Sequence, residues 1–138
     1  AYKTEKINFG IRFGYNNCAK QINSMNMVTD KKEFAEKVLN NSGIQVVEFY
    51  ADWSGTCQMM IPIYKELSLC YNNAANFFAV DVEAAPLLKK ELGVNDLPTI
   101  LFYKNGAIID FVNGMISKNA LFAKMETIIN QKTNHLSN

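Results

Sequence analysis

Histidine, tryptophan, proline and cysteine are all scarce in this chain of 138 residues, which has one histidine, one tryptophan, three prolines and three cysteines. The cysteines stand far apart, at positions 18, 57 and 70, and the histidine is near the C-terminus. A structural zinc site needs four Cys or His ligands that lie close together, so this scarcity argues against one. An odd number of cysteines leaves at least one thiol unpaired, which argues against a disulfide framework. We expect neither a metal nor a cofactor.

Net charge and long apolar runs are scarce as well. The formal charge is +1, whereas a nucleic-acid-binding domain normally has a basic face that raises its net charge. No stretch approaches the roughly 20 apolar residues that cross a membrane. We therefore expect no nucleic-acid partner and no transmembrane segment. The length of one domain and the hydrophobic content of 49% are sufficient for a buried core.

The first 23 residues differ in composition from the rest of the chain. They carry four basic residues against one acidic residue, as part of an organelle-targeting segment would, but they lack serine richness and clear amphipathicity. The alternative is an extension that packs on a partner in a larger assembly or stays mobile. We divide the chain into this extension (1–23), a folded domain (24–131) and a polar tail (132–138). With its unpaired thiols, the chain is expected inside the cell, in the cytoplasm or in an organelle such as the mitochondrion or plastid.

Hydrophobic periodicity along the domain alternates between that of strands and that of helices. The run 46–50 is β-branched, aromatic and nearly continuous in hydrophobicity, which predicts a strand buried on both faces. Asn105-Gly106 predicts a hairpin. The predicted strands are 25–28, 46–50, 77–82, 99–103 and 107–112, and the predicted helices are 31–39, 54–71, 85–92 and 117–131. Strand–helix–strand crossovers imply parallel pairing and the hairpin adds an antiparallel edge, so the predicted fold class is α/β.

Several separated motifs stand out among these elements. They are Glu-Phe-Tyr-Ala-Asp-Trp at 48–53, Gly-Thr-Cys at 55–57, a proline inside a helix at 62, and Leu-Pro-Thr at 97–99, with Lys-Asn-Gly at 104–106 and Gly114 in addition. Over about residues 24–131 this set resembles the thioredoxin family. The resemblance implies a central mixed β-sheet in the order βαβαβαββα, with helices on both faces. It also implies a site for thiol–disulfide exchange at a Trp-Cys-x-x-Cys motif.

Ser54 stands at the position of the first cysteine of that motif. In the family this cysteine begins a helix, where unpaired N–H groups and the helix dipole lower its pKa, and its thiolate attacks a substrate disulfide. A serine hydroxyl ionises far above neutral pH and needs an adjacent base, and the only histidine, His135, follows the last predicted helix. Serine is, however, among the best helix N-caps, worth about 1 kcal/mol relative to alanine. We expect Ser54 to preserve the fold and to abolish the attack.

Cys57 and Glu48 match two further site positions of the family. Cys57 is at the resolving position, but without the first cysteine it cannot release a mixed disulfide within the chain. Cys70, about 20 Å further along the same helix, cannot pair with it. Glu48 matches a buried acidic residue, a candidate proton shuttle whose pKa burial would raise, and the alternative is a carboxylate that reaches water at a strand edge. The neighbouring position, often lysine in the family, aligns with Ala79.

The resemblance also implies a shallow groove that binds an extended protein or peptide segment. Pro98 resembles the cis-proline of the family, whose preceding residue offers its backbone to such a segment. The expected groove residues are Trp53, Gly55, Thr56, Asp96, Leu97, Pro98 and Gly114. The charged residues Asp52, Lys89, Lys90 and Glu91 are expected to be solvated surface charges.

Three interpretations of the serine remain open. In the first, Ser54 is natural and the protein is a redox-inactive binding or structural module. In the second, the protein is a thiol–disulfide oxidoreductase whose nucleophilic cysteine was replaced by Ser54. In the third, it is a single-cysteine redox protein that uses Cys57 with glutathione or another outside thiol.

Overall fold

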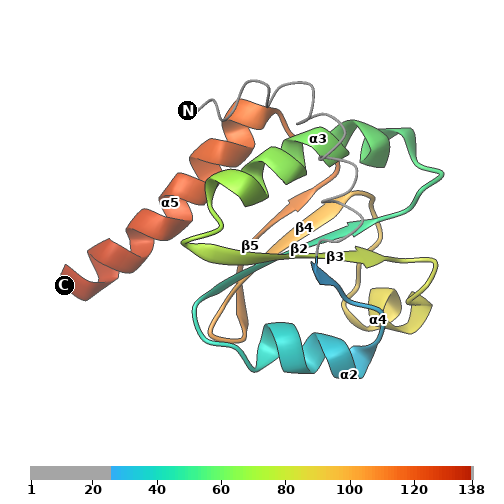
Figure 1. Ribbon diagram of the computed structural model, residues 1–138, viewed down its shortest axis with the longest axis horizontal. Coiled ribbons are helices and arrows are strands. Elements are labelled where there is room, and N and C mark those ends of the chain that lie inside the picture. Colours follow the sequence, from blue (N-terminus) through green and yellow to red (C-terminus); the bar gives the residue numbers. More distant parts are fainter. Residues whose placement is uncertain (1–25, 138) are drawn as a thin grey trace, which may run out of the picture.

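The computed structural model describes residues 26–137, so the expected extension at 1–23 lies outside the described residues (Figure 1). The elements are β1 (Asn26–Met27), α2 (Lys31–Phe34), a π-helical turn η1 (Ala35–Leu39), β2 (Ile44–Tyr50), α3 (Gly55–Cys70), β3 (Ala75–Asp81), α4 (Pro86–Glu91), β4 (Thr99–Lys104), β5 (Ala107–Asn113) and α5 (Lys118–Ser137). This order confirms the predicted α/β class. The backbone of α5 continues to Ser137, beyond the predicted helix end near Gln131.

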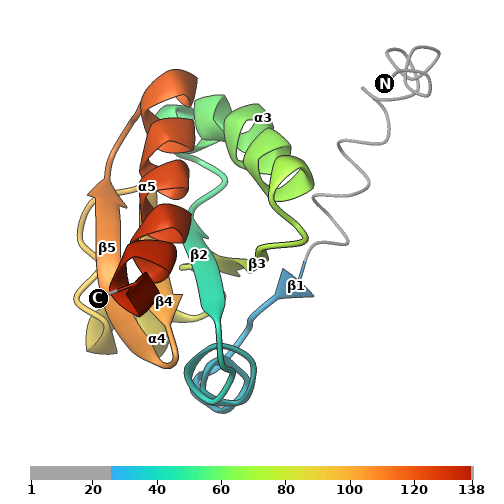
Figure 2. The same ribbon diagram turned by 90° about the vertical axis from the view of Figure 1, so that its left-hand side faces the viewer.

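The five strands form one mixed sheet in the order β1-β3-β2-β4-β5. The strands β1, β3 and β2 pair in parallel, as their crossovers predict, and β5 pairs antiparallel with β4, as the hairpin predicts. β4 also pairs antiparallel with β2, so the crossover through α4 does not give the expected parallel pairing. Helices cover both faces, with α3 and α5 on one side and α2, η1 and α4 on the other (Figures 1 and 2). No helix among the described residues has the length and apolar composition needed to cross a membrane.

Each face of the sheet carries its own hydrophobic core. On the α2/α4 face, alternate residues of β2 (Val47 and Phe49) pack with Phe34, Val38 and Leu88. The intervening residues of β2 point to the α3/α5 face, where the core consists of Ile44, Val46, Met60, Tyr64, Leu67, Ala75, Phe77, Ile100, Phe102, Val112, Leu121, Met125 and Ile128. Helices and strands that are distant in the sequence therefore pack together on the two faces of β2.

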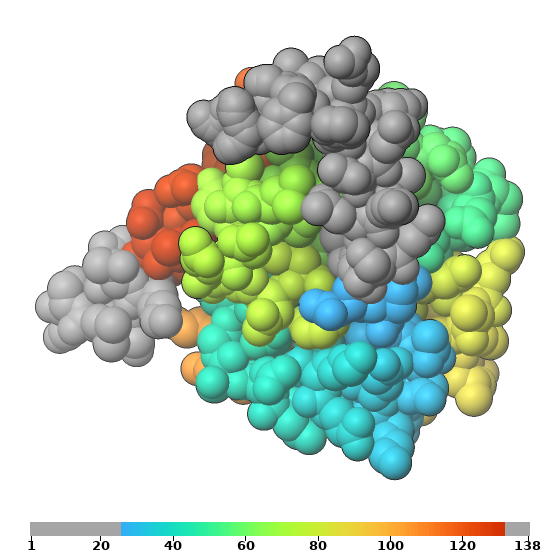
Figure 3. All heavy atoms as spheres, viewed as in Figure 1, coloured from blue at the N-terminus to red at the C-terminus, as the bar shows by residue number. Residues whose placement is uncertain are grey.

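The first helix differs from the regular α-helix predicted over 31–39. Asp30 caps α2 by accepting a hydrogen bond from Glu33 N–H at 2.8 Å. The chain then widens into η1, which ends with Asn40 N–H donating to Ala35 O at 2.9 Å, a five-residue step. In the space-filling view this segment (blue to cyan) and α4 (yellow) form one continuous surface (Figure 3).

The β4–β5 hairpin is tied to the loop that precedes β2. Asn105 and Gly106 both have positive φ, 52° and 85°, as the Asn-Gly signal predicts for a tight turn. Asn105 N–H donates to Gly43 O at 3.0 Å, and Gly43 N–H donates to Asn105 Oδ1 at 2.7 Å. A Cβ at Gly106 would lie 2.6 Å from the carbonyl oxygen of Leu39. Glycine is therefore required there by both conformation and space.

This packing predicts a graded loss of stability at two glycines. Gly93→Ala should lower the free energy of unfolding by about 1 kcal/mol, because its φ of 69° is strained for alanine but nothing lies within 4 Å of the added Cβ. Gly106→Ala should cost about 3 kcal/mol, because the Cβ also meets backbone. Urea denaturation of both variants measures the difference, and equal losses would contradict the close contact with Leu39.

Candidate functional site

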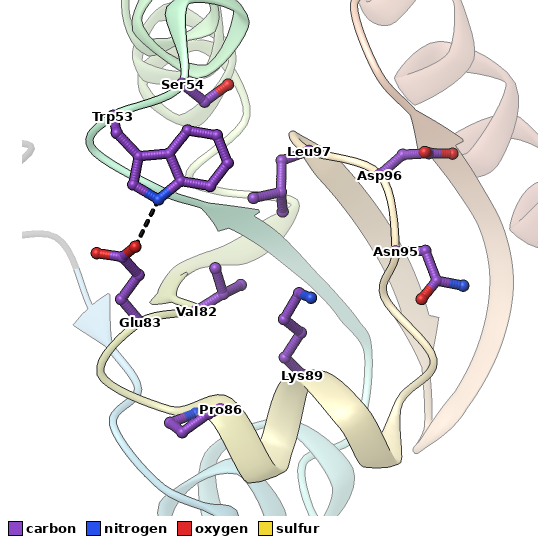
Figure 4. Close-up of a pocket in the computed structure, with 9 residues that line it drawn as sticks. All are labelled: Trp53, Ser54, Val82, Glu83, Pro86, Lys89, Asn95, Asp96 and Leu97. Carbon is purple, nitrogen blue, oxygen red and sulfur yellow. Dashed lines mark hydrogen bonds between the residues drawn. The ribbon is translucent and has the colours of Figure 1, made fainter.

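A pocket of about 600 Å³ opens beside the start of α3. It lies between the segment that follows β2, the segment that follows β3, helix α4 and the loop before β4 (Figure 4). This is the edge at which the parallel strands β2 and β3 end, so their following loops converge there. The lining residues are Trp53, Ser54, Val82, Glu83, Pro86, Lys89, Asn95, Asp96 and Leu97.

Ser54 is the N-cap of α3, as predicted. Its backbone is extended (φ −86°, ψ 121°), and its Oγ accepts a hydrogen bond from Cys57 N–H at 3.3 Å. This bond satisfies one of the N–H groups that have no partner within the helix. The side chain is only 8% exposed, although it lines the pocket. The serine is thus engaged in holding the helix start.

A chain of hydroxyl groups connects Ser54 to the loop before β4. Thr56 Oγ1 donates to Leu97 O at 3.2 Å, and Ser54 Oγ lies 2.9 Å from Thr56 Oγ1. Because a hydroxyl group carries one proton, the Thr56 proton is used by Leu97 O, and the Ser54 proton is donated to Thr56. Within the described residues, the hydrogen bonds of Ser54 Oγ go to this hydroxyl and to a backbone N–H, neither of which is a base.

Both cysteines of α3 are free thiols, and they differ in exposure. Cys57 is 2% exposed and faces the protein interior one turn after Ser54, whereas Cys70 is exposed at the end of the helix. Burial and the neighbouring Glu66 raise the pKa of Cys70. The expectation that these two cysteines do not pair is confirmed.

The loop before β4 contains the predicted cis peptide bond, between Leu97 and Pro98. Gly114 N–H donates to Pro98 O at 2.7 Å and so joins the end of β5 to this loop. Thr99 Oγ1 donates to Asp96 O at 2.5 Å on the other side of the proline. The backbone at 96–98 is therefore held from both sides, next to the pocket.

Trp53 forms one wall of the pocket. Its side chain is 69% exposed, and its indole N–H donates to a carboxylate oxygen of Glu83 at 2.5 Å (Figure 4). This bond connects the segment after β2 to the segment after β3 and orients the indole ring at the pocket rim. An exposed indole held in one orientation offers a large apolar surface to a bound chain at low entropic cost.

Glu48 lies beneath α3 in the middle of the sheet. The carboxyl group is in the central strand β2 and 5% exposed, so the alternative that it reaches water at a strand edge is wrong. Its Oε2 has no hydrogen-bond partner within the described residues. Burial raises the pKa of Glu48 from 4.5 to about 8. Ala79 is its register partner on β3, as the alignment predicts, so a methyl group occupies the position where the family often has a lysine.

The structure brings together some of the predicted groove residues. Trp53, Asp96 and Leu97 line the pocket, whereas Gly55, Thr56, Pro98 and Gly114 do not. Thr56 and Gly114 instead hold the loop through Leu97 O and Pro98 O, and Pro98 is itself buried.

Five pocket residues were not predicted from the sequence, namely Val82, Glu83, Pro86, Lys89 and Asn95. Lys89 in particular was expected to be a solvated surface charge, but it is half-buried and lines the pocket. A usable signal was its spacing, because Pro86 and Lys89 are three residues apart and so lie on one face of α4.

Sequence comparison gives a family for most of the described residues. The family profile of thioredoxin matches residues 25–127. The thioredoxin of Rickettsia prowazekii is 34% identical over 97 residues, which cover 70% of this chain and 91% of that protein. The chloroplastic M-type thioredoxin of Pisum sativum is 32% identical over 108 residues, which cover 78% of this chain and 62% of that protein.

Structure comparison agrees with this result. The crystal structure of the mitochondrial thioredoxin 3 of Saccharomyces cerevisiae, in its oxidized form, matches with a TM-score of 0.69 and 30% identity, covering 76% of this chain and 96% of that chain. The thioredoxin of Plasmodium falciparum matches with a TM-score of 0.66 and 28% identity, covering 78% of this chain and 98% of that chain. The similar proteins thus include one from a chloroplast and one from a mitochondrion.

The burial of Glu48 predicts an unusual dependence of stability on pH. Below about pH 4.5 the carboxyl group is neutral in the folded and the unfolded protein, and its contribution to stability is fully present. Between pH 4.5 and about 8 only the unfolded chain ionises, so the free energy of unfolding falls as the pH rises, by about 4 kcal/mol over the window.

Glu48→Gln should remove this slope and should be more stable than the parent protein at pH 8, while the two differ little at pH 4. Urea denaturation across the pH range measures both profiles. Glu36→Gln, an exposed carboxylate on the first helix, is the control and should leave the slope unchanged. Parallel profiles for Glu48→Gln and the parent would contradict a buried neutral carboxyl group.

Proposed function

Because the chain belongs to the thioredoxin family and carries Ser54 at the attacking position of that family, we propose that it binds extended protein segments beside Ser54 without exchanging disulfides with them. The chain is a thioredoxin-like protein, and its family is one of thiol–disulfide oxidoreductases. The single observation that carries the proposal is that the Ser54 hydroxyl caps α3 and, among the described residues, has only the Thr56 hydroxyl and the Cys57 N–H as hydrogen-bond partners, neither of which is a base.

The absence of turnover follows from this hydroxyl group. Forming an alkoxide at neutral pH needs a neighbouring base. The only histidine of the chain, His135, is in the last turns of α5, and that end of the helix lies across the domain from the start of α3 (Figures 1 and 2). Glu48 is a candidate proton shuttle for the thiol of Cys57. This thiol would act only on a mixed disulfide at position 54, which a serine cannot form.

Binding is supported by the parts of the site that do not depend on sulfur. The indole of Trp53 is held by Glu83, and the loop at 96–98 is held by Thr56, Thr99 and Gly114. A pocket of about 600 Å³ lies between them. Exposed apolar surface, fixed backbone and a pocket for a side chain are what an extended segment needs for recognition.

The second candidate function is disulfide exchange by a form of the protein with cysteine at position 54. The intact surroundings favour it, since a cysteine there would stand at the N-terminus of a 16-residue helix with no acidic residue in its first turn. The dipole of such a helix favours a thiolate. The third interpretation, exchange by Cys57 alone, is disfavoured because its thiol is only 2% exposed.

The first test compares turnover by the serine and cysteine forms. In an insulin-reduction assay with dithiothreitol as the electron donor, the chain with Ser54 should not exceed the uncatalysed rate, because no thiolate can attack. Ser54→Cys should accelerate the reaction by at least about a hundredfold if the rest of the site is competent. Ser54→Cys combined with Cys57→Ser is the control, and it should form a mixed disulfide without turning over. Activity of the serine form would overturn the proposal.

The second test measures binding without chemistry. Trp53 is the only tryptophan of the chain and lies at the pocket rim, so its fluorescence reports occupancy directly. Titration with the S-carboxymethylated B chain of insulin, which is extended and has no free thiol, should change this emission. Leu97→Glu should weaken binding at least about tenfold, because it places a charge where apolar contact is expected.

Ile108→Glu is the matched control for this second test. Ile108 is 51% exposed on β5, at the hairpin end of the strand and away from the loop before β4. The same change of charge there should leave binding intact. No saturable change in Trp53 emission, with any of these proteins, would contradict the binding proposal. Thermal unfolding followed by circular dichroism verifies that each variant is folded.

A further inference from the structure

Lys89 is placed to contact whatever occupies the pocket beside Ser54. It lies on α4, one turn after Pro86, and its half-buried side chain extends from the helix into the pocket between Val82 and Asn95 (Figure 4). The long aliphatic part of the side chain runs along the pocket wall, and the ammonium group is at its tip. Such a side chain buries its stem while its charge stays available.

The ammonium group of Lys89 has no partner among the described residues. Within the part of the chain that the structure describes, Lys89 Nζ forms neither a hydrogen bond nor an ion pair. Several other lysines are paired. For example, Lys31 of α2 forms an ion pair at 3.2 Å with Glu91, which is on α4 like Lys89. An unpaired, half-buried cation in a pocket is available to a ligand of opposite charge.

The two carboxylates of the pocket are directed elsewhere. The Glu83 carboxylate accepts the hydrogen bond of the Trp53 indole at the rim, and the Asp96 carboxylate points away from the pocket (Figure 4). Neither forms an ion pair with Lys89. They reduce the positive potential of the pocket, so Lys89 suits a single negative charge better than a doubly charged group.

We propose that Lys89 is a specificity-determining residue that selects extended segments with an aspartate or glutamate side chain next to the residue facing Ser54. This inference rests on the proposed binding function and names the chemistry of its partner. The acidic side chain enters the pocket and pairs with Lys89, while its neighbour in the segment packs on Trp53 and Leu97. Partial shielding from solvent makes such a pair stronger than one on an open surface.

The test uses three fluorescein-labelled peptides of about ten residues, built from alanine and serine around one central valine. They are identical except that the residues flanking the valine are all glutamate, all glutamine or all lysine. Fluorescence polarisation should show that the parent protein binds the glutamate peptide about fivefold more tightly than the glutamine peptide, and the lysine peptide most weakly. The preference should shrink when NaCl is raised from about 0.05 to about 0.5 M.

Two substitutions separate the pocket from the overall charge of the protein. Lys89→Gln should remove the preference for glutamate, and Lys89→Glu should reverse it in favour of the lysine peptide. Lys90→Gln removes the same charge from an exposed position on the same helix and should leave the preference intact. Thermal unfolding shows whether each variant is folded.

The outcomes distinguish this inference from the proposed function. Saturable binding of all three peptides with equal affinity, or equal effects of Lys89→Gln and Lys90→Gln, would overturn the role of Lys89 and leave binding at the pocket standing. Binding of none of the peptides, together with no response to the insulin B chain, would overturn the proposed function itself.

Discussion

Burial of the central strand on both faces is the constraint on which the rest of the structure depends. All residues of β2 except Tyr50 are buried, and neighbouring side chains point into different cores. This strand holds β3 on one side and β4 on the other, so it determines where the segments following β2 and preceding β4 meet. It also places an ionisable carboxyl group, Glu48, on the face of the sheet that α3 covers. The site is thus positioned by the same packing that sets the register of the sheet.

Assembly of the site in this chain does not depend on a cysteine at position 54. The bonds that hold the loop at 96–98 and orient Trp53 use hydroxyl, amide, indole and carboxylate groups, and none of them uses sulfur. Serine even serves the helix start better than many residues, because its oxygen accepts the bond of Cys57 N–H. A serine can therefore replace the attacking cysteine of the family at position 54 while the surrounding pocket keeps its structure.

Much of the fold could be predicted because its signals are local. Asn105-Gly106 encodes the hairpin, Ser54 encodes the start of α3, and the apolar run at 46–50 encodes the central strand. The π-helical turn at 35–39 could not be predicted, because its five-residue hydrogen bond leaves no distinct sequence period. The pocket residues Glu83 and Lys89 were missed for a different reason. Their importance comes from contacts between segments that only tertiary packing brings together, and as single charged residues they are indistinguishable from solvated ones.

The hydrogen bonds between Gly43 and Asn105 give the two ends of the sheet different tolerances to insertion. At the hairpin end, one backbone bond and one bond to the Asn105 side chain join the turn at 105–106 to Gly43, and Gly106 lies against the Leu39 carbonyl, so an added residue in this turn would break these contacts. At the pocket end, the segment after β3 is joined to the end of β2 by one backbone bond, from Val82 N–H to Tyr50 O, and further out only by the side chains of Trp53 and Glu83. Chain length and sequence around α4 can therefore vary during evolution while strand register is maintained from the far end. New binding preferences can arise at one edge of the sheet without the fold having to change.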